Sequence, residues 1–214
     1  MDIGNIRIFR PGPAAVIARL CDVLRIPEII DSVVPWNPAQ CRLSPGTRVK
    51  ALIINLLVDR RALYQVWRFY QHQDLEVLFG PEAQVRAEEL NDDALARALD
   101  KLAASDLKTL FSSIALRAAA THDAPIDRLH VDTTSISVQG AYEGEGELEI
   151  TFGFSKDRRP DLKQFLIGLT VSGDGLPVLA QSLAGNTSDK KWYPEVVEQL
   201  RATFSPKSSR RSFS

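Results

Sequence analysis

The spacing of apolar residues changes between residues 121 and 127, and this change limits the chain to a fold with separate helical and sheet parts. From about residue 13 to residue 120, apolar residues recur at helical spacing. After residue 127, short apolar runs are separated by turn residues, as in strands. The expected fold class is therefore α+β, with an all-helical N-terminal half followed by a part built on a sheet.

Helix starts are marked in the N-terminal half by capping residues. Ser44 precedes Pro45, and proline is favoured at the first helical position. Asn91 precedes two aspartates, which favour the positive end of a helix dipole. Ser105 and Asp106 open a further apolar pattern of helical period. We expect a helix to begin at each of these three places.

The C-terminal half predicts strands followed by one helix. A strand is expected over residues 129–138, and the apolar run 165–171 has the character of a central strand. Residues 172–175 form a turn signal before a third strand over 176–183. Weak alternation over 148–154 predicts one more strand. Residues 192–204 predict a helix.

Composition excludes several classes of protein. The formal net charge is −1, which argues against a protein that coats nucleic acid without specificity. No run approaches the roughly 20 apolar residues of a membrane span, so no membrane partner is expected. The only two cysteines, Cys21 and Cys41, have no metal-site spacing and predict a reducing compartment. The expected location is the cytoplasm.

Asp132 is the candidate functional residue that the strand pattern singles out. It lies in the run 128–138 beside β-branched residues such as Val131 and Ile136. Burying a carboxylate that has no partner costs roughly several kcal/mol. A buried Asp in this strand would therefore need a partner. A divalent cation with oxygen ligands is one such partner. The alternative is an aspartate that caps a turn at the strand end.

Four strings give the chain a resemblance to a known family. They are Leu90–Leu95, His130–Ser135, Gly153–Gln164 and Gly185–Asp189. Together they resemble bacterial insertion-sequence transposases of the DDE class, in the insertion-sequence-1634 group of the IS-four superfamily. The segment Leu43–Ala51 resembles part of the helical domain that precedes the catalytic core in that group.

The resemblance implies DNA cut-and-join chemistry on a ribonuclease H-like fold. Such enzymes hold two Mg²⁺ ions between an Asp, a second Asp and a Glu, and the metals activate the nucleophile and stabilise the leaving oxygen. Asp132 matches the first acid and is thereby the expected catalytic residue and metal ligand. The family's second Asp follows the helix that corresponds to 192–204, and its Glu lies further on.

The chain is expected to contain only the first part of that core. Residues 10–120 are expected to form the helical transposase-associated domain, 121–204 an incomplete ribonuclease H-like α/β core, and 205–214 a polar tail that is disordered or out of frame. This predicts a truncated transposase with weak Mg²⁺ binding and no activity of its own. A linker at 205–214 is the alternative explanation of the tail.

A basic segment between two predicted strands is the candidate DNA contact. Its basic residues are Lys156, Arg158, Arg159 and Lys163. Arg and Lys bind phosphate oxygens, so this loop is predicted to contact the DNA backbone. The alternative is a solvated loop in which Asp157 and Asp161 form ion pairs with these basic side chains. Asp189 is expected to cap the following helix rather than to bind metal.

Two functions from different classes remain open. One is a DDE-type transposase fragment that acts on the terminal inverted repeats of an insertion sequence. The other is a DNA-binding or dimerisation module, possible as a homo-oligomer, that competes with an intact transposase. A third interpretation, an unrelated metal nuclease, would require two more acids that converge on Asp132.

Overall fold

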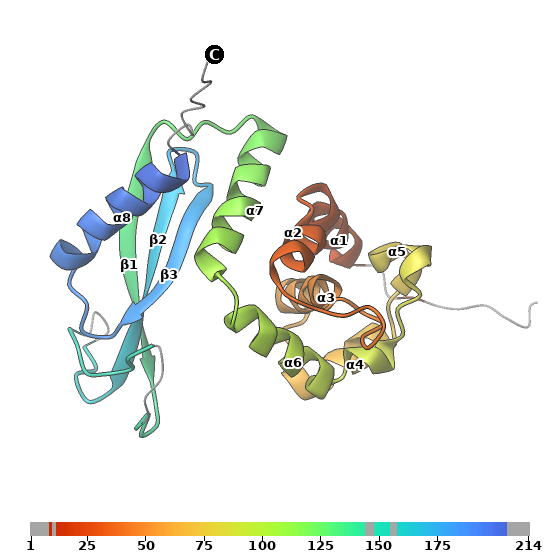
Figure 1. Cartoon of the computed structure of the whole chain (residues 1–214). Helices are drawn as coiled ribbons and strands as arrows, with labels where there is room; N and C mark the ends of the chain where they lie inside the picture. The colour runs from red at the N-terminus through yellow and green to blue at the C-terminus, as the bar shows by residue number, and fades with distance from the viewer. Residues whose placement is uncertain (1–8, 10–11, 144–147, 155–157, 205–214) are drawn as a thin grey trace, which may run out of the picture. The chain divides into compact units, whose positions relative to one another are not determined.

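The computed structural model describes residues 9, 12–143, 148–154 and 158–204 (Figure 1). The chain divides into two compact units, Met1–Thr121 and His122–Ser214. The fold class is α+β, as the sequence predicts. Within the described residues, no helix is long and apolar enough to span a bilayer.

The helical unit consists of α-helices and short 3-10 helices. Its elements are α1 (Ala14–Val23), α2 (Ile26–Val33), α3 (Pro45–Val58), η1 (Leu63–Gln65), α4 (Val66–Tyr70), α5 (Leu75–Phe79), η2 (Pro81–Ala83), η3 (Ala87–Leu90), α6 (Asp92–Ala103) and α7 (Leu107–His122), whose last residue falls in the second unit.

The three predicted helix starts are confirmed. The Ser44 hydroxyl accepts a hydrogen bond from the Thr47 N–H at 3.1 Å before α3. The Asn91 side-chain oxygen accepts one from the Ala94 N–H at 2.9 Å before α6. Asp106 likewise accepts from the Thr109 N–H at 3.1 Å before α7. Each bond satisfies an N–H that lacks a partner inside its helix.

Helix α3 is shared by the two apolar clusters of the helical unit. Ala51 and Ile54 are fully buried in the larger cluster, which also contains Tyr70. Val49, on the same helix, packs in the smaller cluster with Ile30. The Tyr70 hydroxyl donates a hydrogen bond to the Ala51 carbonyl at 2.7 Å, which ties α4 to α3.

Replacing Tyr70 with phenylalanine tests this link through pH. Burial raises the pKa of the Tyr70 phenol well above its usual value, so the folded protein keeps it neutral. An unfolded tyrosine ionises near pH ~10, so the stability from Tyr70 is complete below that pH and falls above it. Tyr70→Phe should cost about 1 kcal/mol at neutral pH and reduce the loss of stability above pH ~10. Urea unfolding at several pH values measures both; an unchanged alkaline loss would contradict the assignment.

The second unit is an antiparallel sheet followed by a helix. Strands β1 (Leu129–Val138), β2 (Lys163–Ser172) and β3 (Pro177–Ala184) lie in the order β1-β2-β3, and α8 (Asp189–Phe204) follows. The predicted central strand is thus confirmed as β2. The strand predicted over 148–154 is wrong: that segment makes only an isolated bridge between Thr151 and Gln164.

One face of this sheet is covered by α8 (Figure 1). Trp192 of α8 is 1% exposed and packs with Leu179 and Val196. It reaches the sheet at Gly168, where an added Cβ would lie 2.3 Å from the Trp192 ring. The absence of a side chain at Gly168 therefore makes room for the indole.

The other face of the sheet leaves apolar side chains partly exposed. On β2 it carries Phe165, Ile167 and Val171, which are half-buried, and Leu169, which is 37% exposed. Exposed apolar surface on a sheet promotes association of chains.

Leu169→Thr should therefore reduce aggregation without unfolding the sheet. Threonine keeps the preference for a strand and removes apolar surface. We expect less light scattering on heating and a higher soluble fraction at equal concentration. Leu179→Thr is the matched control, because Leu179 is 3% exposed on the face toward α8 and its loss should destabilise the unit. Equal effects of the two substitutions would contradict this description of the faces.

Candidate functional site

Asp132 lies in the middle of β1, directly opposite Leu169 of β2. Its side chain is exposed, whereas the neighbouring Thr133 is 4% exposed. The expectation of a buried carboxylate was wrong. Successive side chains of a strand point to opposite faces, and only the face that carries Thr133 is covered by α8.

The Asp132 carboxylate accepts a hydrogen bond from the backbone N–H of Thr133 at 2.8 Å. Among the described residues β1 pairs with β2 alone, so it is an edge strand. Edge strands present backbone groups that no neighbouring strand satisfies. Asp132 thus occupies an exposed, accessible position on an open edge of the sheet.

Asp189 approaches β1 from the side of α8. The Thr133 hydroxyl donates to its carboxylate at 3.0 Å. Asp189, for which the sequence predicts a capping role, is the first residue of α8, where negative charge is favoured, and it joins that helix to β1. Thr133 therefore contacts both acids, Asp132 through its N–H and Asp189 through its hydroxyl.

A cavity of about 260 Å³, lined by both polar and apolar side chains, lies at this junction. Gln164 is one of its lining residues: it is 2% exposed, and its amide nitrogen donates to the Gly185 carbonyl at 2.7 Å. The Gln164 side-chain oxygen is buried without a hydrogen-bond partner. Asp132 is not among the lining residues, so the cavity and the exposed carboxylate are separate features. Sequence reasoning missed Gln164, because nothing in a strand pattern marks a buried glutamine. The remaining polar lining comes from Thr133, Ser135, Asn186, Thr187, Ser188 and Asp189.

The residues around Asp132 do not fit a site for two Mg²⁺ ions. In the described part of the chain, no three His, Cys, Asp or Glu side chains are grouped as metal ligands would be. Asp132 faces Leu169, and the acid linked to it through Thr133 approaches from the other side of β1. Mg²⁺ requires near-octahedral oxygen ligands, and one exposed carboxylate supplies too few.

One arginine of the basic segment forms an ion pair with an aspartate of the same segment. Arg159 donates two hydrogen bonds to Asp161, at 2.8 and 2.7 Å. These bonds hold the pKa of Asp161 below its usual value. Lys163, at the start of β2, donates to the Ala141 carbonyl. Arg158 is exposed and has a left-handed backbone, with φ of 57°. Lys156 lies outside the described residues.

Comparison with known proteins gives one match. Residues 13–116 match the model of a domain of unknown function (DUF4277). The matched residues run from the start of α1 into α7 and so lie within the helical unit. No curated protein and no solved structure matches the chain. The N-terminal half of this protein is thus similar to a domain whose activity is not known.

Proposed function

We propose that this chain is a DNA-binding protein of the DDE transposase class and that its second unit is the beginning of a ribonuclease H-like core. The observation that carries the proposal is the position of Asp132 in the middle of β1, the first strand of an antiparallel β1-β2-β3 sheet. Transposases and nucleases of that fold place their first metal-binding acid on the first strand of such a series.

The open edge of β1 supports the same proposal. In the resembled family, the second acid ends a strand that follows the helix corresponding to α8. A strand added at the free edge of β1 would bring its side chains next to Asp132. The arrangement is therefore compatible with a core to which one further strand is added beside Asp132.

For the described residues, we propose binding to DNA ends without cutting. Two-metal phosphoryl transfer requires several acids around both ions, and Mg²⁺ is not expected to bind tightly to Asp132 alone. The intended partner is the terminal inverted repeat of an insertion sequence. A chain that binds such ends without cutting would compete with an intact transposase, as a monomer or a homo-oligomer. The free thiols Cys21 and Cys41 favour a cytoplasmic location.

Selection of duplexes from a random-sequence pool tests DNA binding. The full chain should enrich a shared sequence over successive rounds, and the enriched duplex should bind more tightly than a scrambled one in a gel-shift assay. Replacing Arg158 and Arg159 by alanine should weaken binding to both duplexes alike and lower the salt dependence, because phosphate contacts carry no sequence information. Failure of the chain to retain any duplex at low salt would overturn the proposal.

Asp132→Asn tests the proposal that the chain does not cut. Asp132 is exposed, so the substitution should change the free energy of unfolding by less than about 0.5 kcal/mol. Neither the chain nor this variant should nick supercoiled plasmid in Mg²⁺. Nicking that Asp132→Asn abolished would contradict the proposed absence of cutting. Nicking that the variant retained would remove Asp132 from the mechanism.

A further inference from the structure

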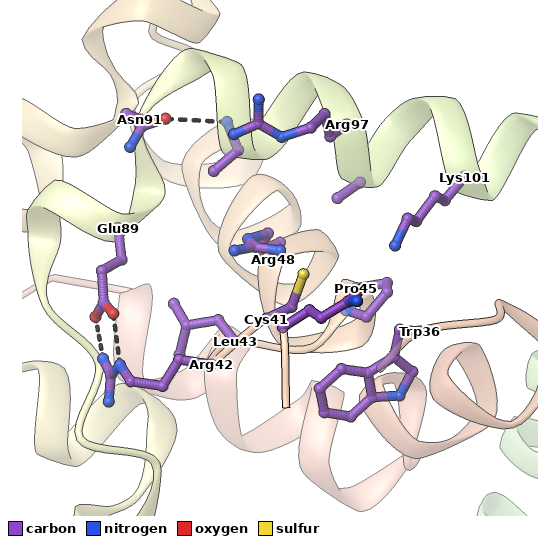
Figure 2. Close-up of a pocket in the computed structure, with 13 residues that line it drawn as sticks. Trp36, Cys41, Arg42, Leu43, Pro45, Arg48, Glu89, Asn91, Arg97 and Lys101 are labelled. Atoms are coloured by element: carbon purple, nitrogen blue, oxygen red, sulfur yellow. Dashed lines mark hydrogen bonds and ion pairs between the residues drawn. The ribbon is translucent and has the colours of Figure 1, made fainter. Parts of the chain in front are cut away.

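A cavity of about 390 Å³ opens in the helical unit between α3, α6 and the segment that precedes α3 (Figure 2). Every lining residue belongs to that unit. This volume lies within the range of small-ligand sites. It therefore has room for a phosphate and for part of the group attached to it. Its charged and aromatic lining consists of Trp36, Arg42, Arg48, Glu89, Arg97 and Lys101.

The single acidic residue that lines this cavity forms an ion pair with one of the four basic residues that line it. Glu89 forms an ion pair with Arg42, drawn as two dashed lines in Figure 2. Burial alone would raise the pKa of Glu89, but the hydrogen bonds from Arg42 and from the Arg86 backbone lower it below its usual value. Arg42 also donates to the Gln84 carbonyl at 2.7 Å. Arg42 and Glu89 therefore neutralise each other.

Three cations remain without a counter-charge. Among the residues that the structure describes, Arg48, Arg97 and Lys101 form no ion pair. Arg97 and Lys101 are four residues apart on α6, which places them on one helix face, where like charges repel. The cavity thus gathers three cations that pair with no acid in the described part of the helical unit.

Arg48 gives a second, independent reason to expect an anion in the cavity. It lies on α3, and its Nε–H is buried without a hydrogen-bond partner. A buried donor of a charged group that stays unpaired is costly, and a native protein usually has a reason for keeping one. An anion in the cavity would accept this hydrogen bond and balance the neighbouring charges.

We infer that this cavity binds one phosphate group of a DNA strand, held by Arg48, Arg97 and Lys101. Arginine matches phosphate with two parallel hydrogen bonds, and lysine adds a compact charge. Trp36 is half-buried and borders the same cavity, where it offers a flat apolar surface to the attached sugar or base (Figure 2). The choice of DNA as the source of the phosphate rests on the proposed function.

Charge reversal at α6 tests the site in the full chain. The variant Arg97→Glu/Lys101→Glu should weaken binding of a labelled duplex at least about tenfold in fluorescence anisotropy, and the salt slope should fall by about 1, the contribution of one phosphate. The control Arg19→Glu/Lys108→Glu makes the same change in net charge at exposed positions outside the cavity. Equal weakening by both variants would overturn the site.

Arg48→Met separates binding from folding. Methionine keeps an unbranched apolar stem and removes the unpaired donor, so the melting temperature should stay the same or rise. Duplex binding should nevertheless weaken about tenfold. A lower melting temperature with unchanged binding would assign Arg48 a purely structural role and overturn the inference.

Cys41 reports on occupancy and on the source of the phosphate. Its half-buried thiol lines the cavity, whereas the only other cysteine, Cys21, is 2% exposed. A duplex, added at concentrations near its dissociation constant, should slow modification of Cys41 by a thiol reagent in the wild type but not in Arg97→Glu/Lys101→Glu. Protection by deoxyadenosine monophosphate without protection by the duplex would overturn DNA as the source. If the wild type binds duplex but neither protects Cys41 nor responds to the α6 variant, the site fails while the proposed function stands.

Discussion

Replacing Trp192 with alanine is expected to lower the free energy of unfolding of the second unit by about 3–5 kcal/mol, the usual cost of removing a large buried aromatic side chain. Trp192 is 1% exposed, and the apolar cluster beneath α8 is built around it and Leu179. Without the indole, α8 loses its main contact with the sheet. Chemical denaturation followed by far-UV circular dichroism measures the effect.

Trp192→Phe is the control for this substitution. The Trp192 indole N–H is buried without a hydrogen-bond partner, so phenylalanine keeps an aromatic ring and removes an unsatisfied donor. We expect a much smaller loss than for alanine. A loss below about 1 kcal/mol for Trp192→Ala would mean that α8 is not held in this way.

The contact between Gly168 and Trp192 can be tested by substituting both residues, separately and together. A methyl group at Gly168 would lie 2.3 Å from the Trp192 ring, so Gly168→Ala should cost about 1–3 kcal/mol by overpacking. In the Trp192→Ala background the same methyl group enters vacated space, and its cost should disappear or change sign. Additive effects in this double-mutant cycle would show that the two residues are not in contact.

Asp22→Asn is expected to give the second large loss of stability, in the helical unit. Lys50 of α3 is 3% exposed, and its ammonium lies 2.6 Å from the Asp22 carboxylate. It also lies 5.5 Å from the centre of the Phe79 ring. Removing one partner of a buried pair typically costs about 3–5 kcal/mol. Because the Asp22 side chain is 44% exposed, we expect a value near the lower end.

Lys50→Met is the matched control for the buried charge. Methionine fills similar space without needing a counter-ion, so the free energy of unfolding should be unchanged or higher. The comparison therefore reverses the usual expectation that deleting either partner of an ion pair is equally harmful. If Asp22→Asn and Lys50→Met had equal costs, the pair itself would be stabilising, and the interpretation of Lys50 as a costly buried cation would be wrong.

The helix starts and strand positions were predictable because they depend on neighbours in the chain. Ser44 and Asn91 each cap a helix through a residue three positions ahead, so the sequence alone contains the whole interaction. The strand at 129–138 and the central strand at 165–171 were likewise predicted from runs of apolar and β-branched residues. The predicted strand at 148–154 failed, since its weak alternation was not matched by a partner strand.

The sequence by itself therefore determined the α+β class, the positions of most helices and strands, and the place of Asp132 on the first strand. Only the tertiary structure decided that Asp132 is exposed, that Gln164 is buried, and that Arg48 and Arg97 line one cavity. The physical reason is that periodicity reports the two faces of an element but not which face another element covers. Burial and the convergence of distant side chains arise from packing between segments far apart in the chain.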